Sequence, residues 1–109
     1  DEVLKEVAKR LRTSLPAAAE VGRWGGEEFL AVVDDCPLSA AREIAERLRR
    51  ALCDAPLAIG EKALAVTASF GVASLPVPSA DAIDPLIGAA DHALYRAKHE
   101  GRNRVEVAG

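Results

Sequence analysis

Residues 20–33 of the chain read Glu20-Val21-Gly22-Arg23-Trp24-Gly25-Gly26-Glu27-Glu28-Phe29-Leu30-Ala31-Val32-Val33. Two short runs of extended character flank a pair of glycines in this stretch. Glycine tolerates the positive φ angles that a tight hairpin turn needs, so we predict a β-hairpin that turns at Gly25 and Gly26. The residues on either side of the hairpin change to a helical period.

Helical periodicity predicts one helix before the hairpin and two after it. In the first, apolar side chains share one face and Pro16 ends the segment: Val3, Leu4, Val7, Ala8, Leu11 and Leu15. An apolar stripe over residues 41–52 predicts the second, with Ser39 as its N-cap. The third should begin at Asp84-Pro85, an N-cap followed by a first-turn proline, and end with Gly101 as its C′ residue.

The remaining segments predict strands. Leu57-Ala58-Ile59 and the segment from Ala63 to Ser74 flank a turn at Gly60-Glu61-Lys62. The longer segment is nearly all apolar, which fits a central strand covered on both faces. Arg104-Val105-Glu106-Val107 predicts a short edge strand. The order is therefore α-β-β-α-β-β-α-β, an α/β (α+β) fold with helices packed on a mixed sheet.

Composition limits the class of protein. At 109 residues the chain is one domain or most of one, and its 50% apolar content suits a globular core. The net charge of −3, from 14 basic and 17 acidic residues, argues against a surface for nucleic acid or membrane. No apolar stretch reaches the roughly 18 residues of a membrane span, and no signal peptide opens the chain, so we expect a cytoplasmic domain, or the cytoplasmic portion of the parent protein if that is membrane-anchored.

Two cysteines, Cys36 and Cys53, flank the second predicted helix. They form no Cys-x-x-Cys motif, and only His92 and His99 supply imidazoles, so we expect no zinc site. We interpret both cysteines as reduced thiols.

Side chains with chemical potential gather at the hairpin. Without Cβ atoms, Gly25 and Gly26 let a base, a ribose or a phosphate approach the backbone closely. Glu27 and Glu28 are expected at the start of the second strand, where successive side chains point to opposite faces and so serve different purposes. A Mg²⁺ ion bound here would need further oxygen ligands. Spacing alone leaves a purely structural interpretation open, because solvated acids often follow Gly-Gly turns.

The stretch Arg23-Trp24-Gly25-Gly26-Glu27-Glu28-Phe29 is similar to the signature of the GGDEF family of diguanylate cyclases, with Glu at its third position. Other segments match the family in order and spacing: Asp1-x-Val3-Leu4, Asp35-x-Pro37 with the helix through Leu48, Val66 to Ala73, and Asp91 to Asn103. This resemblance covers nearly the whole chain. It implies a nucleotide-cyclase or palm-like, ferredoxin-type architecture.

The resemblance also implies a reaction. In the family each domain holds one GTP, and two domains face each other as a homodimer to form cyclic di-GMP by phosphoryl transfer. Gly25 and Gly26 should line the nucleotide, and Glu28 should bind Mg²⁺ or Mn²⁺. Glu27 is the candidate for activating the 3′-hydroxyl, directly or through the metal.

Three more positions acquire roles from the resemblance. Lys98 and Arg102 correspond to a pair that binds the triphosphate. They lie four residues apart at the end of the last predicted helix, so they should project the same way. Taken alone, they would also suit a solvated helix end that complements the helix dipole. Asp1 corresponds to a carboxylate that accepts hydrogen bonds from guanine, whereas Asp91 should have a structural role.

Two departures from the family pattern matter. The family's first strand and helix, which carry a metal-binding aspartate and a phosphate-contacting lysine, have no counterpart in residues 1–109. We therefore interpret the chain as the C-terminal two-thirds of a GGDEF domain and expect little or no activity from it alone. The family's product-inhibition motif Arg-x-x-Asp is replaced by Pro16-Ala17-Ala18-Ala19. Arg47 matches a secondary contact of that site but cannot replace the motif, so we expect no product inhibition there.

Two other interpretations stay open. In the first, the domain is a non-catalytic module that binds GTP, cyclic di-GMP or a protein partner. In the second, it is a folded fragment without binding activity. Intact Gly25 to Phe29, Lys98 and Arg102 favour the enzyme, because a site out of use has no reason to keep them.

Overall fold

The computed structural model describes residues 2–75 and 80–108, and its elements follow the predicted order except that two strands, β4 and β5, stand where one was predicted over residues 63–74. Over these ranges the helices are α1 (Glu2–Ser14), α2 (Leu38–Cys53) and α3 (Ile83–His99), with a 3₁₀ turn, η1 (Ala80–Ala82), before α3. The strands are β1 (Glu20–Gly25), β2 (Glu28–Val32), β3 (Leu57–Ile59), β4 (Lys62–Leu64), β5 (Phe70–Val72) and β6 (Val105–Val107).

The strands of the described residues pair in three small sheets of two strands each. β1 with β2 and β3 with β4 are antiparallel, whereas β5 with β6 is parallel. Pairings of both kinds, beside helices, confirm the predicted α+β class. The final strand joins the end of the chain to the middle of the fold, with Phe70 opposite Val105 and Val72 opposite Val107.

The predicted strand from Ala63 to Ser74 is wrong in its extent. β4 ends at Leu64 and β5 begins at Phe70, and within the described part of the chain no strand pairs with residues 65–69. Val66 and Ala68 pack against the core, whereas Ala65 and Thr67 are exposed: one face of the segment is covered and the other is not. An apolar composition indicates that a segment can be buried, but not whether a neighbouring strand is there to pair with it.

Two helix N-termini differ from the prediction, and one C-terminus agrees. α2 begins one residue before Ser39, with Pro37 in the N-cap position and no side-chain cap. α3 begins one residue before Asp84, because η1 leads directly into it; the carboxylate of Asp84 lies in the first turn, where the helix dipole favours it. The predicted end of α3 is confirmed, since Gly101 has a φ of 130° and follows the C-cap residue Glu100.

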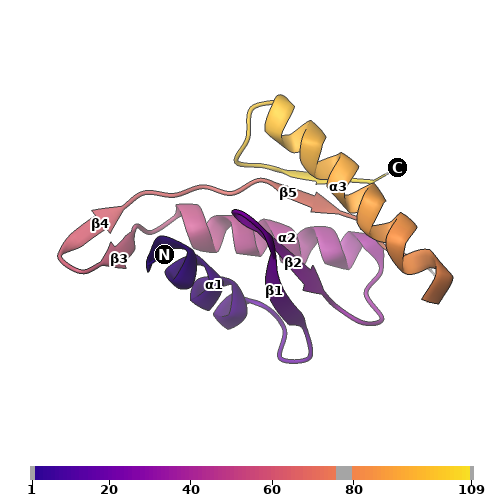
Figure 1. The fold of residues 1–109 in the computed structure, drawn as a ribbon, viewed down its shortest axis with the longest axis horizontal. Helices are drawn as coiled ribbons and strands as arrows, with labels where there is room; N and C mark the ends of the chain where they lie inside the picture. Colours follow the sequence, from indigo (N-terminus) through magenta and orange to yellow (C-terminus); the bar gives the residue numbers. More distant parts are fainter. Residues whose placement is uncertain (1, 76–79, 109) are drawn as a thin grey trace.

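The main core lies between α1, α2 and the β1–β2 hairpin. Leu11 in the last turn of α1 and Leu15 just after it meet Leu48 and Leu52 of α2, and all four are buried. Apolar side chains of the hairpin and of the segment leading to β5 cover this cluster: Val21, Phe29, Val33, Val66, Ala68 and Phe70. Figure 1 shows α1 beside α2 and the hairpin crossing in front of α2. The apolar stripes predicted for the two helices therefore face each other.

The parallel pair β5–β6 lies between α2 and α3 (Figure 1). Ala93 and Ala97 of α3 are fully buried. A Cβ atom at Gly71 of β5 would lie only 2.0 Å from Ala90 O and 2.3 Å from Leu94 N. α3 thus packs directly on the backbone of β5, an approach that only glycine permits. This contact determines where the last turn of α3 lies.

Arg10 ties α1 to the end of α2. Its Nη1 donates to Ala51 O at 3.2 Å and to Ala55 O at 2.7 Å, and its Nη2 donates to Pro56 O at 3.2 Å. Ala51 belongs to the last turn of α2, where backbone carbonyls lack partners within the helix. One guanidinium therefore serves three carbonyls and holds the connection between α2 and β3.

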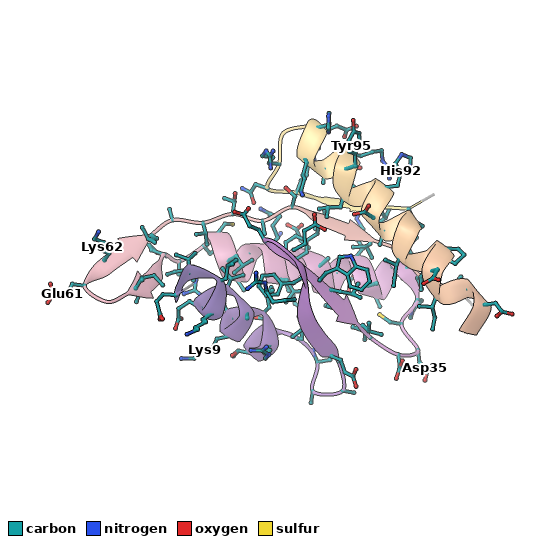
Figure 2. All side chains as sticks on the ribbon, viewed as in Figure 1. Lys9, Asp35, Glu61, Lys62, His92 and Tyr95 are labelled. Carbon is teal, nitrogen blue, oxygen red and sulfur yellow. The ribbon has the colours of Figure 1, made fainter. Side chains whose placement is uncertain are left out.

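The β3–β4 hairpin and α3 lie at opposite ends of the long axis, which measures 46 Å. Figure 2 shows Glu61 and Lys62 at the tip of that hairpin, and His92 and Tyr95 on the outer side of α3. Among the residues that the structure describes, no helix is both long and apolar enough to cross a membrane.

Candidate functional site

The hairpin turn lies one residue later than predicted. Gly25 pairs with Glu28, so the two turn residues are Gly26 and Glu27. Gly26 has a φ of 51°, which explains the glycine, and its carbonyl oxygen accepts a hydrogen bond of 2.5 Å from Arg23 Nη2. Glu27 therefore belongs to the turn and not to β2. The prediction that Glu27 and Glu28 alternate along one strand is wrong.

A β-bulge at Trp24 causes this shift. Arg23 lies opposite Phe29, but the next pair is Gly25 with Glu28, so Trp24 is an extra residue on β1. The Trp24 side chain is 59% exposed, which is unusual for so large an apolar group. The bulge thus sets an aromatic surface directly before the turn.

Gly25 is required neither by its backbone conformation nor by packing. Its φ lies outside the positive region, and a Cβ atom at this position would meet nothing within 4 Å. The strand would therefore accept a larger side chain without strain. A glycine at such a position leaves open backbone surface, which is what a closely approaching ligand needs.

The fold brings Glu28 and Lys98 together from distant parts of the sequence. Glu28 is the first residue of β2, Lys98 lies in the last turn of α3, and Lys98 Nζ is 3.6 Å from Glu28 Oε2. Their side chains are 42% and 37% exposed, so the ion pair contributes at most about 1 kcal/mol to stability. A weak, accessible pair exchanges partners readily: a phosphate can replace Glu28 at the ammonium, and a cation can replace Lys98 at the carboxylate.

Arg102 is not placed by helical spacing. α3 ends at His99, Gly101 turns the chain, and Arg102 N donates to Ala97 O at 2.9 Å in a Schellman-type closure. The prediction that Lys98 and Arg102 project the same way from one helix is therefore wrong, because the helix has ended before Arg102. The Arg102 side chain is exposed and has no hydrogen bond or ion pair with any described residue.

Among the described residues, no hydrogen bond or ion pair joins Arg47 or Asp91 to Glu28 or Lys98. Asp1 lies outside the described residues. Arg47 is exposed on α2. Asp91 is exposed on α3 and its side chain has no hydrogen bond or ion pair with the described part of the chain, so its predicted structural role gains no support.

A resident metal has no ready set of ligands in the described residues. No group of three or more His, Cys, Asp or Glu side chains is placed there to hold an ion, and the free thiols are Cys36, before α2, and Cys53, the last residue of α2. The carboxylates of Glu27 and Glu28 are nonetheless the kind of donor that Mg²⁺ prefers, and Mg²⁺ is commonly held by one or two carboxylates with substrate phosphates and water. The residues present therefore fit a cation that arrives with a phosphate ligand.

An arginine without a predicted role, Arg49, lies beside the turn after α3. Arg49 of α2 pairs with Glu46 and donates from Nη1 to Asn103 Oδ1 at 3.0 Å. The hydrogen bond from Arg49 holds the pKa of Glu46 below its usual value of 4.5. No local pattern predicts this contact, because it joins residues far apart in the sequence. A hollow of about 570 Å³ also borders Glu46 and β6, but no predicted site residue lines it.

The sequence matches the protein family described as "Diguanylate cyclase, GGDEF domain" over residues 1–104. The chain belongs to the GGDEF family. The β1–β2 hairpin is the segment that carries the family's signature, so the resemblance stated from residues 23–29 is confirmed.

Relatives and solved structures agree with this assignment. Diguanylate cyclase DgcP of Pseudomonas aeruginosa is 40% identical over 108 residues, which are 99% of this chain and 16% of DgcP. The diguanylate cyclase SiaD of P. aeruginosa, solved with its activator SiaC, superposes with a TM-score of 0.85 at 35% identity, over 97% of this chain and 40% of SiaD.

The active GGEEF domain of a diguanylate cyclase from Vibrio cholerae superposes with a TM-score of 0.82 at 31% identity, over 100% of this chain and 68% of that one. Its motif is the one found here at residues 25–29. This GGDEF chain spans about a sixth of the length of DgcP and two-fifths of the SiaD chain.

Proposed function

We propose that this GGDEF domain binds GTP at the β1–β2 hairpin, in a protein that condenses two GTP molecules into cyclic di-GMP. The observation that carries the proposal is the 3.6 Å contact between Lys98 Nζ and Glu28 Oε2. It joins a cation suited to phosphate and a carboxylate suited to a divalent metal, close in the chain to the open backbone of Gly25. The family and the cyclases among its relatives support the reaction.

Charge neutralisation is the first task of such a site. Phosphoryl transfer depends mainly on positioning and on balancing negative charge. In this proposal Lys98 and Arg102 bind the triphosphate through charge-assisted hydrogen bonds. The phosphate takes the place of Glu28 beside Lys98, which releases the Glu28 carboxylate. Gly25 and Gly26 let the nucleotide lie against the backbone of the turn.

The two glutamates have separate roles in the proposal. Glu28 would hold Mg²⁺ or Mn²⁺ together with phosphate oxygens, and the ion, when bound, would neutralise phosphate charge and lower the pKa of a coordinated hydroxyl. Glu27 is exposed in the turn, which supports a role in accepting the proton of the 3′-hydroxyl. The 3′-oxygen of one GTP then bonds to the α-phosphorus of the other, and pyrophosphate leaves.

A single copy of the chain would not complete this reaction. One domain holds one GTP in the proposal, so a second copy must face the first. We expect little or no turnover by residues 1–109 alone, because the described residues provide no group of three metal ligands. GTP as substrate and the free thiols Cys36 and Cys53 agree with a cytoplasmic location.

Regulatory binding of GTP or cyclic di-GMP without turnover is the second candidate function. The incomplete ligand set among the described residues favours it. Lys98 and Arg102 would serve binding and catalysis equally, so an assay must separate the two.

Incubating the full-length protein with GTP and Mg²⁺, and measuring cyclic di-GMP and pyrophosphate, makes this separation. We expect product from the unmutated protein, loss of product in Glu28→Ala and a raised KM in Lys98→Ala. Glu61→Ala is the matched control, because Glu61 is an exposed carboxylate at the tip of the β3–β4 hairpin, on another element (Figure 2).

Three outcomes discriminate between the functions. GTP binding by calorimetry without product would favour the regulatory module. Product formation by Glu28→Ala at the unmutated rate would refute the site proposed here. The cyclase proposal also requires that the gene encode, before residue 1, a strand with an Asp-x-Asp-x-Phe-Lys-like segment.

A further inference from the structure

We propose that Arg49 of α2 is a positioning residue that holds Arg102 in its binding orientation through Asn103. The inference rests on the proposed function, in which Arg102 binds the triphosphate. It goes beyond that function by giving a role to a side chain outside the hairpin and outside α3.

The turn that carries Arg102 has a costly backbone conformation. Arg102 and Asn103 have φ angles of 62° and 46°, so two consecutive residues other than glycine lie in the left-handed region. Asparagine tolerates this region because its short side chain can hydrogen-bond locally, but arginine gains no such compensation. Contacts from elsewhere must therefore hold the turn in this form.

Hydrogen bonds hold the turn on both sides and across it, where Arg104 Nη1 donates to Glu100 O. On its first side Arg102 N donates to Ala97 O at 2.9 Å, which closes the end of α3. On its second side Phe70 N donates to Arg104 O at 2.9 Å, where β6 begins to pair with β5. Between them, the side chain of Asn103 is held by Arg49 Nη1 at 3.0 Å. In Figure 1 the chain leaves α3 and turns back toward α2 before it enters β6.

Arg49 is itself well fixed. Its guanidinium donates from Nε to both carboxylate oxygens of Glu46 at 3.1 Å and from Nη2 to Oε1 at 2.5 Å. The side chain is only 19% exposed. Because Glu46 already orders the guanidinium, the bond to Asn103 costs little additional side-chain entropy. Arg49 thus connects α2 to the turn through an ordered side chain.

The neighbouring Arg50 offers a matched comparison. It also approaches Glu46, with Nε 3.4 Å from Oε1, but its side chain is 65% exposed. No hydrogen bond links Arg50 to the turn after α3 in the described part of the chain. Replacing Arg50 removes the same charge from the same helix and leaves the support of Asn103 intact.

The test is calorimetric titration of the full-length protein with a non-hydrolysable GTP analogue and Mg²⁺. We expect Arg49→Met to weaken binding about fivefold, the effect of losing one hydrogen bond from a charged donor at a partly exposed site. Arg50→Met should bind within about twofold of the unmutated protein. Binding of GMP, which lacks the β- and γ-phosphates, should be the same in all three.

A double-mutant cycle decides whether Arg49 acts through Arg102. In an Arg102→Ala background, Arg49→Met should cause no further loss. Asn103→Gly provides a second variant that removes the acceptor while easing the left-handed backbone, and it should weaken GTP-analogue binding as Arg49→Met does.

Each alternative result overturns a defined part of the inference. Weakening by Arg102→Ala, with unchanged binding in both Arg49→Met and Asn103→Gly, would overturn the role of Arg49 alone. Additive losses from Arg49→Met and Arg102→Ala would show that Arg49 acts by another route. Binding that Lys98→Ala and Arg102→Ala leave unchanged would overturn the proposed function and this inference with it.

Discussion

Replacing Gly71 with alanine tests how the fold sets the position of α3. A Cβ atom at residue 71 would lie 2.0 Å from Ala90 O, 2.3 Å from Leu94 N and 2.8 Å from Leu94 Cα. All three atoms belong to the helix backbone, so no side-chain rotation relieves the clash. α3 would have to move away from β5 by about 1.4 Å to restore ordinary van der Waals contact.

That movement would lower the stability because the interface between α3 and β5 is tightly packed. Ala93 and Ala97 are fully buried in it, and a displaced helix would lose their contacts with the sheet. Overpacking of this kind, with the loss of contacts around it, destabilises a core by about 3 kcal/mol. Domains of this size have total stabilities of about 5–15 kcal/mol, so the change should be large on that scale.

Urea unfolding followed by circular dichroism measures the effect as a lower midpoint at unchanged slope. Gly22→Ala is the control on β1, because its added Cβ would meet nothing within 4 Å and its φ is not positive; its stability should change by no more than about 0.5 kcal/mol. Equal midpoints for Gly71→Ala and Gly22→Ala would refute the packing argument. Since Lys98 lies at the far end of the displaced helix, Gly71→Ala should also weaken GTP-analogue binding under conditions where it is folded.

Three further predictions concern the turn and two arginine contacts. Gly25→Ala should leave the urea midpoint unchanged but weaken GTP-analogue binding at least about fivefold, because its Cβ meets no protein atom yet would occupy the space left for the nucleotide; unchanged affinity would contradict this. Arg10→Met should lower the free energy of unfolding by about 2 kcal/mol, since three carbonyls lose their donor and exchange it for water. Arg12→Met, at an exposed residue of the same helix, is its control. Equal urea midpoints for the two variants would show that the hydrogen bonds of Arg10 do not stabilise the fold. The pKa of Glu46 is lowered chiefly by its hydrogen bond from Arg49, so its contribution to stability is present above pH 4.5 and is lost as the pH falls through the lower pKa of the folded state. The difference in the free energy of unfolding between the unmutated protein and Glu46→Gln should therefore narrow below pH 4.5. A constant difference across that range would contradict this role of Glu46.

Local chemistry explains which features were predictable. Apolar side chains at helical spacing predicted α1 and α2, and their stripes meet at Leu11 and Leu48. The glycine pair predicted a hairpin within one residue of its turn, because only glycine suits the positive φ found at Gly26. Gly101 likewise predicted the end of α3. The signature and its flanking segments were enough to predict the family.

The wrong predictions concern residues whose position depends on contacts with distant parts of the chain or on a neighbouring strand. The strand register places Glu27 in the turn and the bulge at Trp24 brings Gly25 into β1, and local alternation cannot reveal an extra residue opposite a partner strand. The long apolar segment before β5 lacks a paired neighbour over residues 65–69, which its composition does not report. Arg102 lies beyond α3 because a Schellman closure ends the helix before it. Helical spacing in the sequence therefore predicted the wrong position for its side chain.

The sequence by itself determined the helices, the hairpin and the family, because each depends on residues within a few positions of one another. Only the tertiary structure decided that Glu28 meets Lys98 and that Arg49 reaches Asn103. Both contacts depend on how closely α3 and its following turn approach β2 and α2. That approach is set by glycine at residue 71, where the absence of a single Cβ lets a helix rest on a strand.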